Sequence, residues 1–156
     1  NSDKVIFPGV GAADSAMKQL KSSGLHKLIP KLTQPVLGIC VGMQLMCKTS
    51  KEGDVDCLGI IDVEVKKFEK GLKIPHMGWN NIQNIKSDLF KNNCEQKQMY
   101  FVHSYYVPIN KYTIATTNYG VPFSAAIQKD NFYAVQFHTE KSGDIGEEIL
   151  KNFLEL

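Results

Sequence analysis

Short apolar runs and stretches of helical periodicity alternate along the first part of the chain. Apolar runs over Lys4 to Phe7 and Val36 to Ile39 predict two strands, because each run is short and lies next to glycine or proline. Between them, Met17 and Leu20 recur at helical spacing and predict a helix. A shorter helical segment is expected over Leu25 to Leu32.

The middle of the chain is richer in strand patterns. Ile61, Val63 and Val65 alternate with charged residues, which predicts a half-exposed strand. We expect Pro75 to Asn80 to form a loop and Gln128 to Asn131 to form a hairpin turn. Further strands are expected over three apolar segments, which are Met99 to Val107, Tyr112 to Thr117 and Phe123 to Ile127.

The last segment predicts a closing helix. Apolar residues recur every three or four positions from Ile145 to Leu156, and Asp144 with Glu147 resembles a capping box at the start of this helix. Taken together, the patterns indicate an α/β fold with a mixed sheet, whose parallel part comes early in the chain and whose antiparallel part comes late.

Composition favours one compact domain over residues 1–156. The chain has 156 residues, of which 43% are hydrophobic, and it contains neither an internal repeat nor a linker. No apolar stretch approaches the length of a membrane span, and no leader sequence is visible. We therefore expect a cytoplasmic protein that does not associate with membranes.

Charge and cysteine usage exclude further classes. The chain has 18 lysines and no arginine, and its net charge of +2 is too small to indicate a nucleic-acid surface. The cysteines lack C-x-x-C pairing, so neither a zinc site nor a disulfide framework is indicated, and we expect reduced thiols and no metal. They are Cys40, Cys47, Cys57 and Cys94.

The pentapeptide from Gly38 to Gly42 has the composition of a strand-to-helix elbow around a nucleophile. Such a turn needs a small residue on each side, because the sharp bend crowds the flanking side chains. Cys40 would then present its thiol at the carboxyl end of a strand. A cysteine in such apolar surroundings is otherwise a small buried residue, so the catalytic interpretation needs a base from elsewhere in the chain.

His138 is the best candidate for that base. It follows an apolar, aromatic-rich strand candidate over Phe132 to Phe137, and Glu140 stands two residues beyond it. In an extended segment these two side chains would point the same way. A carboxylate beside an imidazole fixes its tautomer and stabilises its protonated form, although a polar strand end has the same His-x-Glu pattern.

Several longer motifs make the pattern specific. The segments VLGICVGMQLM, PGVG, FVHSYYV and VQFHTEKS occur in the order found in the class I, or triad, glutamine amidotransferases, which the chain resembles over essentially its whole length. PHMGWN and GVPFSAAI narrow the resemblance to the glutaminase subunits of imidazole glycerol phosphate synthase, from histidine biosynthesis. The resemblance implies a flavodoxin-like α/β fold and a glutaminase that needs no cofactor.

The resemblance also implies a strand, a helix and a second strand ahead of KVIFPGVG, a unit of about 30 residues or more. The chain begins at Asn1 without an initiator methionine, so an amino terminus that lacks this unit is expected. In a flavodoxin-like strand order, Lys4 to Phe7 would then be an unpaired apolar edge. We expect the resulting fragment to be poorly stable or prone to aggregation.

By this resemblance, Cys40 attacks the carboxamide of glutamine, His138 transfers the proton and Glu140 orients the histidine. Ammonia leaves, and a glutamyl thioester remains. The oxyanion is expected to bind backbone N–H groups at Val41 and in the Gly9, Val10, Gly11 loop. The remaining carried-over positions face L-glutamine, and they are Gln44, Glu52, Ser104 and Tyr105.

The resemblance places a second group of residues at the contact with a (β/α)₈ barrel, the cyclase subunit of a heterodimer. The barrel would use the ammonia to make imidazole glycerol phosphate and an aminoimidazole carboxamide ribotide. Without the resemblance, Trp79 would equally well be a tryptophan buried under a loop. The expected interface residues are Met77, Trp79, Asn80, Tyr100 and Lys141.

Thr139 departs from the family pattern, which commonly has proline between the histidine and the glutamate. Proline would hold the preceding histidine in an extended conformation, so we expect a looser His138 here. Two alternatives stay open. The first is a different enzyme with the same triad, either a paralogous glutaminase that feeds a surface-sugar amidotransferase or a Cys-His-Glu hydrolase of the wider flavodoxin-like group. The second is a catalytically silent remnant that only binds a partner.

Overall fold

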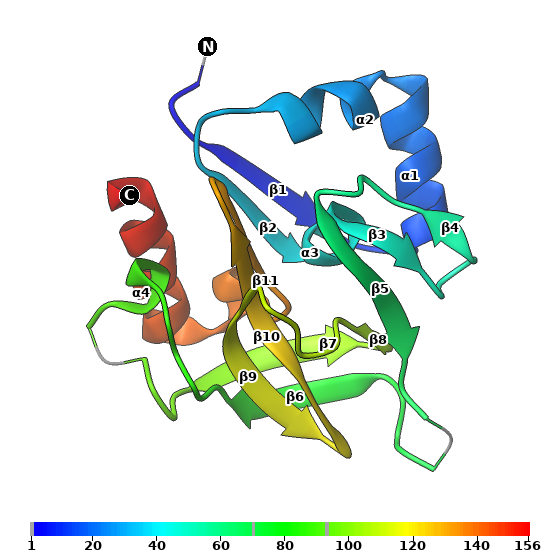
Figure 1. Cartoon of the computed structure of the whole chain (residues 1–156). Coiled ribbons are helices and arrows are strands. Elements are labelled where there is room, and N and C mark those ends of the chain that lie inside the picture. Colours follow the sequence, from blue (N-terminus) through cyan, green and yellow to red (C-terminus); the bar gives the residue numbers. More distant parts are fainter. Residues whose placement is uncertain (1, 70, 93) are drawn as a thin grey trace.

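A five-stranded mixed sheet forms the centre of the molecule (Figure 1), in a computed structural model that describes residues 2–69, 71–92 and 94–156. Its strand order is β1-β2-β11-β10-β9. The first three strands run parallel to one another, and the last three form antiparallel pairs. In that order the strands span Val5–Gly9, Val36–Cys40, Phe132–Val135, Val121–Lys129 and Thr113–Tyr119.

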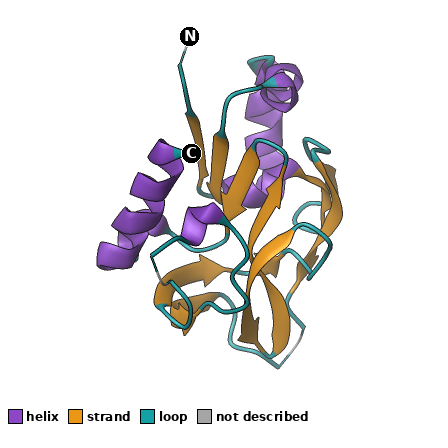
Figure 2. Cartoon of the chain, turned by 60° about the vertical axis from the view of Figure 1, so that its left-hand side comes forward, coloured by secondary structure: helices purple, strands orange, loops and turns teal. Residues whose placement is uncertain are grey.

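Helices cover both faces of this sheet. Helix α1 (Ala13–Ser22) and the short α2 (Leu25–Leu28) lie on one side, while α4 (Gly143–Glu155) lies on the other, as Figure 2 shows. A 3-10 turn, η1 (Ile29–Lys31), follows α2 and leads toward β2. The helices bury the two faces of the sheet, and the largest fully buried side chains include Phe101, Phe123, Phe137 and Phe153.

Two smaller sheets pack beside the main one. Helix α3 (Val41–Met46) follows β2 directly and leads into a four-stranded sheet of order β4-β3-β5-β8. A two-stranded antiparallel ribbon joins β6 (His76–Asn81) and β7 (Gln98–His103). The remaining elements are β3 (Cys47–Ser50), β4 (Val55–Asp56), β5 (Ile61–Lys67), β8 (Tyr105–Tyr106), η2 (Asp88–Phe90) and η3 (Thr139–Lys141).

The mixed α/β architecture confirms the fold class expected from the sequence. The expected order of its parts is only partly right, because β1 and β2 form an early parallel pair but β11, the last strand of the chain, is also parallel to β2. Strand β1 lies at the edge of the main sheet, as predicted, and Ile6 on it is 46% exposed. The apolar segment Met99 to Val107 is divided at Ser104 into β7 and β8. None of the helices in the described ranges is long and apolar enough to cross a membrane.

Two local predictions are wrong. The segment Pro75 to Asn80 is not a loop, because five of its residues belong to β6 and pair with β7. The capping box at α4 is also absent: the helix is capped by Ser142 without a side-chain hydrogen bond. Glu147 instead lies 2.9 Å from the Nζ of Lys151, one helical turn onward.

Candidate active site

Three loops meet at one edge of the main sheet because their strands are parallel and in register. Gly9 at the end of β1 pairs with Cys40 at the end of β2, and Ile39 pairs with Val135 at the end of β11. The PGVG loop, the cysteine and the segment that carries His138 therefore emerge side by side. The carboxyl ends of parallel strands are where open α/β sheets bind ligands.

The backbone at Cys40 confirms a sharp elbow. Cys40 has φ 55° and ψ −112°, a region that a residue with a side chain rarely occupies, and α3 begins at the next residue. Strain of this kind is a recurrent feature of nucleophiles placed between a strand and a helix. The thiol is held over the end of the sheet although its side chain is 4% exposed.

Close packing explains why glycine flanks the elbow. A Cβ added to Gly42 would lie 1.9 Å from the carbonyl oxygen of Phe7, and one added to Gly38 would lie 3.0 Å from the backbone of Gly42. Gly9 is equally confined, because an added Cβ would lie 2.8 Å from the Gly42 nitrogen. The prediction that small residues are needed at this turn is confirmed, and the reason is contact between α3 and β1.

His138 and Glu140 form a tight pair. The Nδ1 of His138 lies 2.6 Å from Oε1 of Glu140, and the imidazole is 6% exposed while the carboxylate is 53% exposed. Because a carboxylate only accepts hydrogen bonds, Nδ1 carries the proton, which leaves Nε2 of the neutral ring as a base. The two residues do not lie on one extended strand as expected, since Glu140 belongs to η3.

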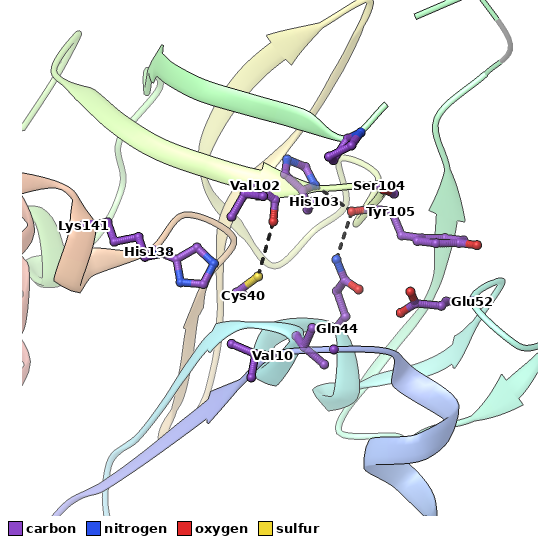
Figure 3. Close-up of a pocket in the computed structure, with 13 residues that line it drawn as sticks. Val10, Cys40, Gln44, Glu52, Val102, His103, Ser104, Tyr105, His138 and Lys141 are labelled. Atoms are coloured by element: carbon purple, nitrogen blue, oxygen red, sulfur yellow. Dashed lines mark hydrogen bonds between the residues drawn. The ribbon is translucent and has the colours of Figure 1, made fainter. Parts of the chain in front are cut away.

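The backbone around His138 is well held. Its N–H donates to the carbonyl of Tyr100 at 2.9 Å, and its carbonyl accepts from the Ser142 hydroxyl at 2.6 Å. These bonds hold the backbone of the segment on both sides, and the effect of Thr139 on His138 stays a prediction. The side chains of His138 and Cys40 lie next to each other in Figure 3.

Burial dominates the electrostatics of the thiol. It raises the pKa of Cys40 to about 11, and the carboxylates of Glu140 and Glu52 act in the same direction. Hydrogen bonds from the Val41 N–H and from the Gln136 amide lower that pKa. Among the described residues, the other hydrogen bond of Sγ runs to the carbonyl of Val102 at 3.9 Å, and none joins the thiol to His138.

A cavity of about 320 Å³ opens above Cys40, a volume within the range of small-molecule sites (Figure 3). The structure brings nine of the predicted site residues to its wall. Gly9 and Glu140 do not line it. Gly9 packs against the first turn of α3, and Glu140 contacts the Nδ1 of His138. The nine are Val10, Gly11, Cys40, Val41, Gln44, Glu52, Ser104, Tyr105 and His138.

Glu52 has a second contact besides the cavity. Its Oε2 accepts a hydrogen bond of 2.9 Å from the N–H of Ala13, at the first turn of α1. A carboxylate at this position is favoured by the helix dipole and satisfies a free N–H. Glu52 lies in the turn after β3, which follows the elbow helix α3.

A protein-family model described as glutamine amidotransferase class-I matches residues 1–156. The chain belongs to the class-I glutamine amidotransferases. It is 61% identical over 158 residues to imidazole glycerol phosphate synthase subunit HisH of Bacteroides fragilis strain YCH46, and 53% identical to that of Escherichia coli K12. Both matches cover 99% of this chain and 81% of the relative. The family resemblance seen in the motifs is thereby confirmed.

Solved structures agree on the fold. A putative GMP synthase protein from Thermoplasma acidophilum superposes with a TM-score of 0.72 at 20% identity, over 99% of this chain and 72% of that one. A glutamine amidotransferase from Thermotoga maritima gives 0.66 at 17% identity, over 98% and 63%. These matches support the class-I amidotransferase fold.

Four residues around the site of this amidotransferase were not predicted from the sequence. Pro75, Val102 and His103 line the cavity, and Gln136 lies behind it in contact with the thiol. The sequence does contain a signal for His103 and Gln136. Both are polar residues inside apolar runs, and a buried polar side chain in a strand needs a partner.

Four of the five expected interface residues of the amidotransferase lie on the β6–β7 ribbon, and the fifth, Lys141, lies on η3. Met77 and Trp79 are 62% and 53% exposed, which contradicts the alternative of a buried tryptophan. Trp79 packs edge-on against Tyr100 at 5.8 Å, and the Nζ of Lys141 lies 6.0 Å from the Tyr100 ring. The Asn80 amide donates to the carbonyl of Asn118 on β9 at 2.9 Å. Lys141 alone among these five also lines the cavity.

Proposed function

We propose that this chain is the glutaminase subunit of an imidazole glycerol phosphate synthase in the cytoplasm, with Cys40, His138 and Glu140 as its catalytic residues. The observation that carries the assignment is the strained cysteine at a sheet edge beside a histidine whose Nδ1 is fixed 2.6 Å from a carboxylate. That arrangement is a nucleophile, a base and an orienting acid. The relatives named above are subunits of that synthase.

The cavity suits L-glutamine in one orientation. Glu52 lies away from Cys40 on the opposite side of Gln44 from His138, as Figure 3 shows, and it would face the α-ammonium group. The carboxamide then extends toward Cys40, with Gln44, Ser104 and Tyr105 along its path. The chain has no arginine, so the α-carboxylate would be bound by backbone N–H groups rather than by a bidentate guanidinium.

The first half-reaction starts with transfer of the thiol proton to Nε2 of His138. The Sγ of Cys40 then forms a bond to the carboxamide carbon, and the carbonyl oxygen becomes an oxyanion. The Val41 N–H, which already faces the sulfur, and the loop over Gly9, Val10 and Gly11 would donate to that oxyanion. His138 returns the proton to the nitrogen, the C–N bond breaks, and ammonia leaves.

The second half-reaction hydrolyses the γ-glutamyl thioester. Water attacks the same carbon while His138 accepts its proton, and the C–S bond then breaks to give glutamate and the thiol. Because burial raises the pKa of Cys40 to about 11, the resting thiol is protonated at neutral pH. His138 must therefore remove the proton before Sγ attacks, and we expect slow turnover in the chain alone.

The first test measures ammonia release from glutamine by the chain together with its cyclase partner. Cys40→Ser should lower turnover at least about a thousandfold, because the serine hydroxyl is a far weaker nucleophile in this site. Cys57→Ser is the matched control, since this half-buried thiol lies outside the cavity and should leave turnover unchanged. Turnover that survives in Cys40→Ser would refute the proposed mechanism.

We also propose that the β6–β7 ribbon binds the cyclase barrel through Met77, Trp79, Asn80 and Tyr100, with Lys141 beside them. Exposed aromatic residues at the centre of a patch are typical of interface anchors. The ribbon leads directly to the cavity, because His103 at the end of β7 lines it. Ammonia released at Cys40 would then pass to the barrel without crossing bulk solvent.

Association of the two purified subunits tests this surface. Trp79→Ala should weaken binding about thirtyfold or more, the usual effect of removing a central aromatic anchor. Leu154→Ala removes an equally exposed apolar side chain on α4, which is 61% exposed, and should leave the affinity unchanged. Equal affinities for the wild type and Trp79→Ala would exclude the ribbon as the main contact.

A further inference from the structure

Two buried glutamine side chains connect the cavity wall to the nucleophile. The Nε2 of Gln44 lies 2.9 Å from the carbonyl oxygen of Tyr105 and 3.0 Å from Oε1 of Gln136. The Nε2 of Gln136 lies 3.8 Å from the Sγ of Cys40. Gln44 is 2% exposed and Gln136 is fully buried, so water does not compete for these contacts. The chain of amides therefore ends at the sulfur.

The direction of each hydrogen bond in this chain is fixed. A backbone carbonyl can only accept, so the Gln44 atom beside Tyr105 must be the amide nitrogen. That nitrogen also faces Gln136, whose nearer atom must then be the carbonyl oxygen. The amide nitrogen of Gln136 is left facing Sγ. Gln136 can thus donate to the sulfur and cannot accept the thiol proton.

We propose that Gln136 is a positioning residue that stabilises the Cys40 thiolate, and that Gln44 and the Tyr105 carbonyl fix its amide in the donating orientation. The proposal rests on the proposed function, in which this thiolate attacks glutamine. A donor that faces an anion strengthens as charge develops, whereas it gives little to a neutral thiol. Gln136 would therefore assist the step in which His138 removes the proton.

The surroundings of the sulfur explain why such a donor is needed. Burial and the carboxylates of Glu140 and Glu52 all disfavour the thiolate. The other titratable groups at the cavity are His138, His103, Lys141 and Tyr105, and within the described residues none of them makes a hydrogen bond to Sγ. The Val41 N–H and the Gln136 amide are the groups that lower the pKa of the thiol.

The test measures thiolate directly and without glutamine. The ultraviolet absorbance of the thiolate is followed from about pH 7 to about pH 10, as the difference from Cys40→Ser, and the alkylation rate of the Cys40 peptide by iodoacetamide is measured in parallel. Gln136→Met keeps the length of the side chain and removes the donor. We expect about tenfold less thiolate at each pH, which corresponds to a rise of about one unit in the pKa of Cys40.

Two more variants separate positioning from packing. Gln44→Met leaves the Gln136 amide in place but removes the group that orients it, so thiolate should fall about threefold. Asn152→Leu removes a buried amide that bonds the Leu89 and Lys91 carbonyls, far from the cavity, and should leave the thiolate unchanged. With the cyclase present, Gln136→Met should lower kcat about tenfold with little change in KM.

Unchanged thiolate in a folded Gln136→Met protein would overturn the proposal. If that variant does not fold, unchanged thiolate in Gln44→Met would overturn it instead, because a purely structural role for the amide chain predicts no shift. The proposed glutaminase function fails on a different result, namely no release of ammonia from glutamine by the wild-type chain with its cyclase partner. The two ideas can therefore be rejected separately.

Discussion

Thr139 lies between His138 and Glu140, and it is a polar residue that is buried in the fold. It is 2% exposed, and its hydroxyl has no hydrogen-bond partner among the described residues. A buried hydroxyl without a partner typically costs about 1 to 3 kcal/mol. The backbone suits the proline common in the family: Thr139 is the first residue of η3, and His138 before it is extended at φ −86° and ψ 105°.

We therefore predict that two substitutions at this residue stabilise the chain. Thr139→Val keeps the shape and removes the hydroxyl, and Thr139→Pro also restricts the unfolded chain; each should raise the free energy of unfolding by about 1 kcal/mol. Urea unfolding followed by circular dichroism measures the change. A Thr139→Val protein less stable than the wild type would show that the hydroxyl has a partner in solution.

At the scale of elements, the site depends on how closely α3 approaches β1. The contact leaves no room for a side chain at Gly42, where an added Cβ would lie 1.9 Å from the carbonyl oxygen of Phe7. A backbone atom cannot move aside as a flexible side chain can. The helix would have to shift away from β1, and the elbow that holds Cys40 would move with it.

Gly42→Ala should therefore lower the free energy of unfolding by about 3 kcal/mol or more and abolish turnover with it. Gly24→Ala is the control, because Gly24 has φ 75° but an added Cβ there meets nothing within 4 Å. That substitution should cost only about 1 kcal/mol of backbone strain and leave turnover intact. Similar losses in both variants would contradict the packing argument.

The strands differ in how well the sequence predicts them. Strands such as β2 and β5 follow the usual rule, with apolar residues facing the core. The motifs around Cys40 and His138 predicted residues that the structure brings together at one cavity. Strand β6 reverses the rule: His76 is buried while Met77 and Trp79 face outward. Periodicity alone therefore indicated a loop. The amide chain through Gln136 depends on contacts between residues far apart in the sequence, which no local pattern contains.

At the scale of the whole molecule, a pair of buried histidines joins the exterior ribbon to the cavity. The Nδ1 of His103 donates to the Tyr105 carbonyl at 2.7 Å, so its Nε2 is the acceptor for the Nδ1 of His76 at 3.0 Å. His103 must be neutral to accept this bond, and the Nε2 of His76 lies 3.4 Å from the amide nitrogen of Asn80, a contact that suits an unprotonated acceptor. Burial lowers the pKa of His103 to about 3 and that of His76 to about 4.

These pKa values make the fold sensitive to mild acid. An unfolded histidine titrates at 6.5, so between pH 6.5 and about 4 the unfolded chain binds protons that the folded chain excludes. Stability is fully present above pH 6.5 and falls as the pH drops below it. At about pH 5 each imidazole should cost about 2 kcal/mol relative to pH 7.5.

His103→Asn isolates this effect, because the asparagine amide can still donate to the Tyr105 carbonyl but does not titrate. The substitution lowers stability at pH 7.5 through lost packing, yet the further loss on going to about pH 5 should be smaller than in the wild type by about 2 kcal/mol. Urea unfolding at the two pH values gives both numbers. An acid-induced loss of the same size in both proteins would mean that other groups control it. The His76–His103 pair links the β6–β7 ribbon to the carbonyl that orients Gln44, so acid should loosen the proposed partner surface and the thiol site together.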